Sequence, residues 1–375
     1  MRAAVRWLPV LAIVATVGAI YYPITARHLQ GQGDFENHIR RAERLTQGII
    51  DVPHIFFHSL VAAGILGGAE PRDAALAVTV SLQVAASLAV FWFVRSYTPA
   101  GPVVAAILAI LALAVGPILP PGTDQSLFML GYFLPNAIHN PTVIAAKPFI
   151  PLLLAVGTTA VGWTAEPRIR IWGAAPIVVL AGLAKPHYVS CITAAAAAAA
   201  VLRTLRGGRV RWRLLGLGLL APSTAVLAWA QFGTIEFAGG GTAMLAPFAV
   251  LGRYVPVDPV SVAQRLASDI AFPLSVAMLW PTTAFRFPAL MLGWAAYAAA
   301  LGQAYLLAES GARMYDGNFI WSGQMATFGL MTASMAFLAQ STAENRAGWR
   351  SLAAWAVLLV QALYWSRWVI VRVGG

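Results

Sequence analysis

Charged residues are scarce in this chain of 375 residues. They make up 10% of it, whereas a soluble globular domain carries about 25%. Hydrophobic residues make up 59%, so there are too few charges to cover a surface that faces water. This shortage excludes an ordinary soluble protein. It predicts an all-α, polytopic transmembrane bundle, because helices satisfy their own backbone hydrogen bonds in lipid.

Cysteine and lysine are also rare. Cys191 is the only cysteine, which excludes an intrachain disulfide. Apart from Lys147 and Lys185, the basic residues are arginines, and the formal net charge is +11. The arginines stand at the ends of apolar segments, which is the topology signal of a membrane protein. We therefore expect membrane lipids around the chain and no nucleic acid as a partner.

Apolar segments of spanning length follow one another along the whole chain. We predict eleven membrane spans within a single transmembrane domain over 1–375, with no soluble domain and with an uncleaved first span. The segment 53–68 is short and carries two histidines, so it is expected to lie on the surface or to re-enter. The predicted spans are 7–23, 74–94, 102–119, 143–164, 171–184, 187–202, 214–230, 266–284, 287–308, 319–340 and 351–371.

The distribution of arginine predicts the orientation. The loop 203–213 has five arginines and no acid, which marks it as cytoplasmic. If 53–68 does not cross, the N-terminus is also cytoplasmic and the C-terminus is outside. Most of the fourteen carboxylates then lie on the outer side. Candidate functional residues are therefore sought at the outer ends of the helices.

The first outer loop contains the segment Gly33-Asp34-Phe35-Glu36-Asn37-His38. From Phe35 onward, apolar residues recur at 35, 39, 42 and 45, which predicts an amphipathic helix in the membrane interface. Asp34 stands at its start. It can simply cap the helix, or it can act as a general base for a hydroxyl group that arrives from the aqueous side.

Two further clusters stand at helix starts. His139-Asn140-Pro141-Thr142 contains groups typical of helix capping, and Lys147 follows inside an apolar segment, where a cation needs a partner or must reach the interface. Lys185-Pro186-His187-Tyr188 is either a tight corner between two spans or a binding site for a lipid-linked phosphate.

The last outer loop holds a compact charged group. Arg313 can form a surface ion pair with Glu309 or Asp316, or it can bind a phosphate through its guanidinium group; Asn318 follows in the same loop. The glycines at 239–241 can form a mobile cover over a site. His54 and His58 have helical spacing but lack the pattern of a zinc site, so no bound metal is expected from them.

The order of these features resembles that of the GT-C class of integral-membrane glycosyltransferases. An inward N-terminus and one span precede an outer loop in which Gly33-Asp34-Phe35 and His38 open an amphipathic helix, and many spans follow. The resemblance implies a polyprenyl-phosphate-linked sugar as donor and a glycan, lipid or protein hydroxyl as acceptor. Inverting transfer would take place on the extracytoplasmic face of a bacterial inner (plasma) membrane, in cell-envelope glycan biosynthesis.

The resemblance also implies roles for these residues. Asp34 is the expected catalytic base. Some members of the class use a divalent cation near such acids, and the sequence leaves open whether Mg²⁺ or Mn²⁺ binds near Asp34. Two alternative functions are a transporter or flippase and a glycan polymerase or ligase, because each would handle the same lipid-linked or anionic substrates. The expected acceptor-positioning residues are Glu36, His38, His139 and Asn140; the phosphate-binding residues are Lys147, Lys185, His187, Tyr188 and Arg313; further outer-loop candidates are Glu309, Asp316 and Asn318.

Overall fold

A computed structural model describes residues 2–30, 34–118, 132–136, 139–164, 169–238, 242–344 and 348–374. Gly33, at the start of the first polar segment, and the glycines 239–241, expected as a mobile cover, lie outside the described residues. Within the described part all regular secondary structure is helical except for a short antiparallel hairpin of β1 (Ala243–Leu245) and β2 (Leu307–Glu309). The predicted all-α fold class is confirmed to this extent.

The helices follow in the order that the apolar segments predict. A π-helical stretch, Leu214–Leu220, leads directly into α11. Short 3₁₀ turns lie at Ala284–Arg286 and Gly311–Arg313. The α-helices are α1 (Arg2–His28), α2 (Asp34–Thr46), α3 (Phe56–Leu66), α4 (Pro71–Tyr97), α5 (Pro102–Ala114), α7 (Pro141–Ala146), α8 (Phe149–Ala160), α9 (Ile171–Ala184), α10 (Pro186–Leu205), α11 (Ala221–Ala238), α12 (Ala249–Tyr254), α13 (Pro259–Asp269), α14 (Ala271–Leu279), α15 (Pro288–Leu306), α16 (Ile320–Ala343) and α17 (Gly348–Gly374).

Among the described residues, six helices are long and apolar enough to cross a membrane. This agrees with a membrane-embedded protein, while the count of eleven spans stays a prediction. Two predicted spans correspond to the shorter helices α5 and α9, and one to α16, whose side chains are almost all buried. The other two are broken into α7 and α8 and into α13 and α14. The six helices are Trp7–His28, Pro71–Tyr97, Pro186–Leu205, Leu214–Gly233, Pro288–Leu306 and Gly348–Val369.

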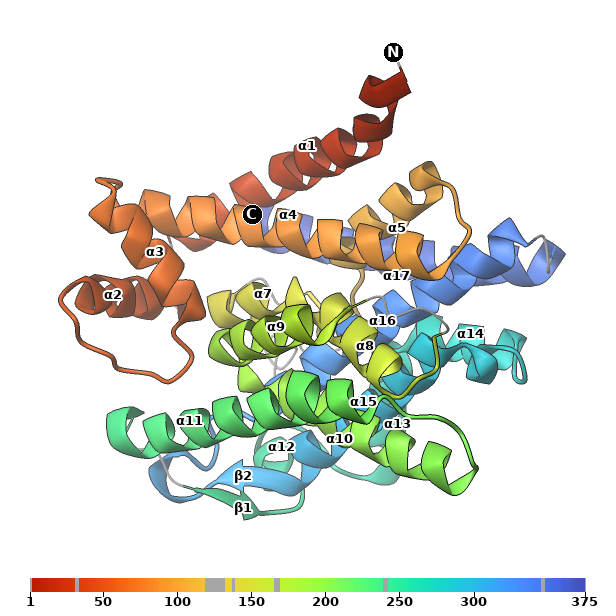
Figure 1. The fold of residues 1–375 in the computed structure, drawn as a ribbon. Helices are drawn as coiled ribbons and strands as arrows, with labels where there is room; N and C mark the ends of the chain where they lie inside the picture. Colours follow the sequence, from red (N-terminus) through yellow and green to blue (C-terminus); the bar gives the residue numbers. More distant parts are fainter. Residues whose placement is uncertain are drawn as a thin grey trace.

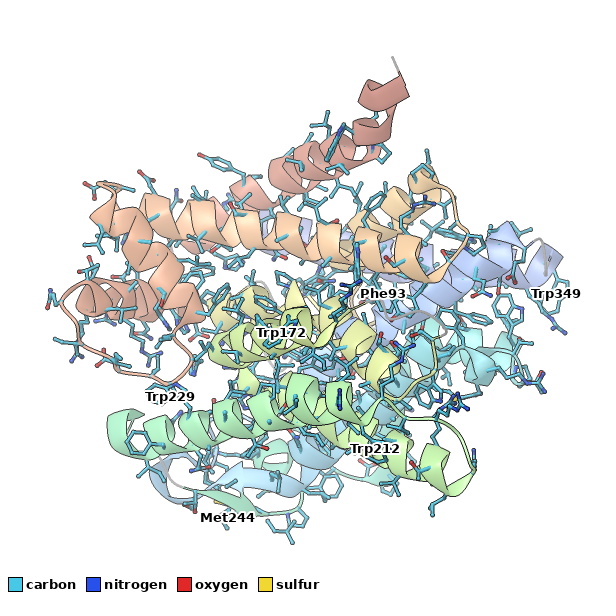
Figure 2. The ribbon with its side chains drawn as sticks, viewed as in Figure 1. Phe93, Trp172, Trp212, Trp229, Met244 and Trp349 are labelled. Carbon is cyan, nitrogen blue, oxygen red and sulfur yellow. The ribbon has the colours of Figure 1, made fainter. Side chains whose placement is uncertain are left out.

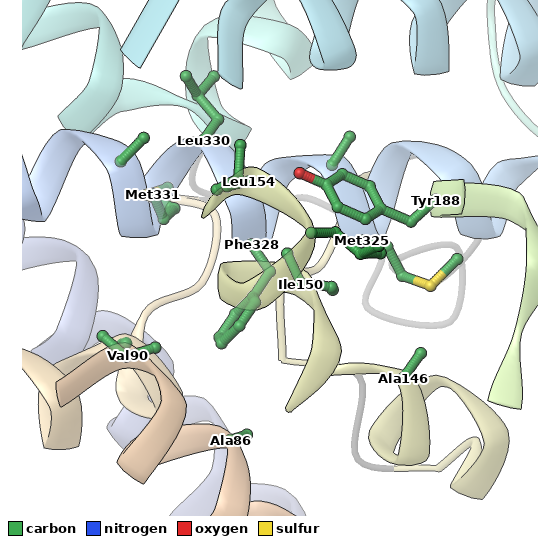
Figure 3. Close-up of a cluster of buried hydrophobic side chains, with 14 of the residues drawn as sticks. Ala86, Val90, Ala146, Ile150, Leu154, Tyr188, Met325, Phe328, Leu330 and Met331 are labelled. Carbon is green, nitrogen blue, oxygen red and sulfur yellow. The ribbon is translucent and has the colours of Figure 1, made fainter. Parts of the chain in front are cut away.

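The helices are stacked in layers around α16 (Figure 1). In that view α1, α4 and α5 form the upper layer, and α10, α11 and α15 form the lower one. Between them, α16 contacts α4, α8, α10 and α15. Figure 3 shows the apolar centre, in which Phe328 of α16 lies among side chains of α8 and α4. The long and largely buried helix α16 therefore lies at the centre of the bundle.

Polar elements collect at one end of this bundle. The helices α2 and α3 and the β1–β2 hairpin lie at the left of Figure 1, whereas the α10–α11 connection and the start of α17 lie at the right. Figure 2 shows Trp229 and Met244 toward the first end and Trp349 at the opposite one. The arginine-rich loop 203–213 and the acidic start of α2 are thus at opposite ends, as the charge distribution predicts.

The helix α2 has the predicted amphipathic character. Its buried residues are Phe35, His38, Ile39 and Ala42, and it packs on α3. At 11 residues, α3 is about 16 Å long, which is too short to cross a hydrocarbon layer of about 30 Å. Both helices therefore form a cap on one end of the bundle, and they supply one wall of the site described next.

Candidate functional site

A cavity of about 1080 Å³ lies at the end of the bundle that α2 and α3 cover. Its walls come from α2, the loop before α3, the starts of α7 and α10, the end of α11, the hairpin and the segment before α16. Segments far apart in the sequence thus meet around one space. Predicted site residues that line it are Asp34, His38, Asn140, Lys185, His187, Glu309, Arg313, Asp316 and Asn318.

Asp34 is oriented by Asn140, which comes from the other side of the cavity. The Asn140 side chain caps α7, because its Oδ1 accepts hydrogen bonds from the backbone N–H groups of Thr142 and Val143. This cap directs Nδ2 away from the helix, and Nδ2 donates to Oδ2 of Asp34 at 3.3 Å. Asn140 is therefore both the predicted capping residue and a positioning residue for the carboxylate.

Lys185 is a buried cation that faces this cavity. Pro186 begins α10, so Lys185 occupies the break between α9 and α10, where it is only 5% exposed. Its Nζ lies 5.4 Å from the ring centre of Trp321, and within the described part of the chain it has no ion pair. Burial lowers the pKa of Lys185 to about 8, partly opposed by Asp34. A buried ammonium group without a carboxylate partner favours binding of an anion.

Two other residues that line the cavity, His187 and Arg313, differ in their hydrogen bonds and ion pairs. His187 packs edge-on against Phe319, and its buried Nδ1 has no hydrogen-bond partner among the described residues. Arg313, in contrast, is 3.3 Å from Glu309 and 3.0 Å from Asp316. Its charge is already neutralised, so the ion-pair interpretation describes Arg313 better than phosphate binding does.

One important cation was missed by the sequence analysis. Arg41 lines the cavity, and it has no ion pair among the residues that the structure describes. It follows Asp34 by seven residues and His38 by three on one stripe of α2, so helical spacing from Asp34 was a signal that could have found it. Two other arginines of α2 reach the same cavity but are occupied: Arg40 donates to Asn37 and Arg44 pairs with Asp51.

Four predicted site residues do not line the cavity. Glu36 points to Arg72, 3.5 Å away, and His139 packs on the ring of Trp321. Tyr188 lies in the apolar centre seen in Figure 3. It packs against Gly329 of α16, where an added Cβ would come within 2.5 Å of the tyrosine hydroxyl. This placement removes Tyr188 from the candidate phosphate ligands.

Lys147 is the fourth, and its environment is structural. It is 1% exposed and does not reach the interface; its Nζ donates to Oδ1 of Asn136 at 3.1 Å. Asn136 in turn donates to the carbonyl oxygens of Ala112 and Val115. The pair joins the break between α7 and α8 to the end of α5, which explains how a lysine is tolerated inside an apolar segment.

We expect the substitution Asn136→Ala to destabilise the protein by about 2–4 kcal/mol, because it leaves a buried ammonium group and two buried carbonyl groups without their partner. Thermal unfolding of the purified protein in detergent measures this effect. The control is Gln340→Ala, which removes only an exposed hydrogen bond to Glu344. An equal unfolding temperature for Asn136→Ala and the wild-type protein would contradict the structural role.

The described residues around Asp34 do not form a site for a divalent cation. No group of three or more His, Cys, Asp or Glu side chains is arranged to hold a metal among the residues described. The nearest acid in the sequence, Glu36, is paired with Arg72, and Asp34 is held by an amide nitrogen. No step of the chemistry below is therefore assigned to Mg²⁺ or Mn²⁺.

Fold and site together define an α-helical membrane protein with a charged cavity at one end of its helices. Comparison with known proteins does not assign the chain to a family. No protein-family model matches the chain, and neither a curated protein nor a solved structure matches it. The function must therefore be argued from the residues of the cavity.

Proposed function

We propose that this protein is an inverting glycosyltransferase that moves a sugar from a polyprenyl-phosphate donor to a hydroxyl group. One observation carries the proposal: the carboxylate of Asp34 lines the same cavity as the cation of Lys185, which has no ion pair among the described residues. A carboxylate can accept the proton of an attacking hydroxyl group, and a buried cation can neutralise a departing phosphate. The reaction needs both groups in one space, and the position of the cavity at the end of the helices suits a substrate with a lipid tail.

In the proposed reaction the acceptor oxygen attacks the anomeric carbon of the donor sugar. The bond between that carbon and the phosphate oxygen breaks, and its electron pair leaves with the polyprenyl phosphate. Asp34 takes the proton of the acceptor hydroxyl, and the anomeric configuration inverts because attack and departure occur on opposite faces. Lys185, with Arg41 beside it, stabilises the negative charge that the departing phosphate gains.

A transporter or flippase for a lipid-linked anion remains the alternative. The cavity charges gather on helix ends and loops, namely at the starts of α2 and α10 and before α16, whereas transporters bind their substrates near the middle of the membrane. This arrangement favours chemistry at a membrane surface. The extracytoplasmic location of the cavity belongs to the same proposal, since it depends on the arginine distribution.

The proposal is tested with the full chain in lipid nanodiscs. Radiolabelled polyprenyl-phosphate sugars serve as donors and octyl glycosides as acceptors. We expect a glycosylated octyl product together with an equal amount of released polyprenyl phosphate. If vesicles containing the protein move the labelled donors across the bilayer without cleaving the bond between sugar and phosphate, the transport alternative is correct and the glycosyltransferase proposal is wrong.

A further inference from the structure

Two buried histidines connect the wall of the cavity to the backbone behind it. Nδ1 of His38, on α2, lies 2.8 Å from Nε2 of His58, on α3, and the two rings are stacked. On its far side, Nδ1 of His58 lies 3.2 Å from the carbonyl oxygen of His54. His38 and His58 are 5% and 1% exposed, but only His38 also lines the cavity.

The carbonyl oxygen at the end of this chain determines which nitrogens carry hydrogen. A carbonyl oxygen can only accept, so Nδ1 of His58 carries the hydrogen that it donates to His54. In a neutral ring, Nε2 of His58 is then an acceptor, and Nδ1 of His38 must donate to it. Neutral His38 is left with a lone pair on Nε2 as its remaining hydrogen-bonding atom.

The surroundings keep both rings neutral. Charged and titratable groups face His38 from each neighbouring element: Asp34 and Arg41 on α2, His54 before α3, and Lys185 before α10. Burial, together with His58, Arg41 and Lys185, holds the pKa of His38 well below its usual range. Burial also lowers the pKa of His58, to about 4. Both shifts favour the neutral form of the two rings at neutral pH.

On α2, Asp34 and neutral His38 are therefore two hydrogen-bond acceptors that line the cavity one helical turn apart. Asp34 and His38 stand at i and i+4, where Cβ atoms are about 5–6 Å apart on a helix. A ligand that satisfies both needs two hydrogen-bond donors with comparable separation, and for the acceptor of the proposed reaction these are two hydroxyl groups. A carbohydrate meets this condition, whereas a simple alcohol does not.

We propose that Nε2 of His38 accepts a hydrogen bond from a second hydroxyl group of the acceptor, and that the acceptor is consequently a carbohydrate. His58 is the positioning residue, because it holds His38 in the form with hydrogen on Nδ1. The inference rests on the proposed function for the identity of the ligand as an acceptor. The two hydrogen bonds from His38 to His58 and from His58 to the carbonyl oxygen of His54 do not depend on the proposed function.

Nitrogen NMR of the full chain in nanodiscs, labelled with ¹⁵N-histidine, tests the first part without any substrate. The chain has six histidines, so single substitutions assign the signals. At pH 7.5 we expect His38 and His58 to be neutral with hydrogen on Nδ1. The substitution His58→Phe should move hydrogen to Nε2 of His38. His54→Gln should leave hydrogen on Nδ1 of His38, because the hydrogen bond from His58 goes to the backbone oxygen of residue 54. A cationic His38, or hydrogen on its Nε2 in the wild-type protein, would overturn the proposal even if the variants failed to fold.

Kinetics test the second part. We expect His58→Phe to lower kcat/KM for octyl glycosides about tenfold, mainly through KM for the acceptor, and to leave any transfer to octan-1-ol unchanged. His58→Glu should restore transfer, because a carboxylate also accepts from Nδ1 of His38, and should shift the acid limb of the pH profile upward. A loss that is equal for both acceptors, or no rescue by glutamate, would assign His58 a purely structural role. Absence of transfer by the wild-type protein would refute the proposed function, whereas contrary NMR signals would refute only the histidine inference.

Discussion

The substitution Asp34→Asn is expected to abolish most sugar transfer, lowering kcat by about 10²–10⁴-fold. The amide cannot take the proton of the attacking hydroxyl group, so the acceptor would have to attack as a neutral alcohol. Asparagine has the same shape, and its Oδ1 can still accept the hydrogen bond from Nδ2 of Asn140. The protein should therefore fold normally and still bind a polyprenyl phosphate.

The measurement is initial-rate transfer from a radiolabelled polyprenyl-phosphate sugar to an octyl glycoside, with unfolding temperature recorded in parallel. Asp73→Asn is the matched control, because Asp73 is an exposed carboxylate in the first turn of α4 and does not line the cavity. We expect Asp73→Asn to transfer at the wild-type rate. A rate for Asp34→Asn within twofold of the wild-type rate would eliminate Asp34 as the base.

The second large effect is expected at Lys185. The substitution Lys185→Met should weaken binding of a polyprenyl monophosphate about 10–100-fold, because it removes a charge-assisted contact in a buried site. Lys185→Arg keeps the charge and should bind more tightly than Lys185→Met. Binding is measured by titrating the probe into protein in nanodiscs. Arg72→Met is the control, since Arg72 is exposed and paired with Glu36 outside the cavity.

The pH dependence of this binding has a defined sign. Only the protonated form of Lys185 attracts the phosphate, and its pKa in the free protein is about 8 because the side chain is buried. Below this value the cation is already present. Above it, binding must take up a proton, so Kd should rise by up to tenfold per pH unit between pH 8 and 9.5. Lys185→Arg should remove this dependence, and an equally steep rise in that variant would show that Lys185 is not the titrating group.

Local patterns predicted the helical parts of the site well. The spacing of Phe35, Ile39 and Ala42 indicated α2, and these residues are buried where that helix packs on α3. Pro186 and Pro141 mark helix starts in both the sequence and the structure. These features are encoded within a few residues, since amphipathicity and helix starts depend on neighbours along the chain.

Pairing between distant residues could not be predicted in this way. Asp34 and Asn140 are 106 residues apart in the sequence, and nothing local indicates that they meet. Lys147 was expected to bind phosphate or reach the interface, but a distant contact with Asn136 holds it in the interior. Tyr188 follows His187 directly, yet the turn of α10 sends one side chain to the cavity and the other into the core.

The sequence by itself determined that the protein belongs in a membrane, that it is helical, and that acids and arginines are separated, because hydrophobicity, helix periodicity and charge bias are properties of short segments. Only the tertiary structure decided which polar residues share a space. The cavity is built from helix ends that lie far apart in the chain, so its membership depends on how the helices pack. That packing paired Arg313 with two acids and left Lys185 and Arg41 without such partners among the described residues.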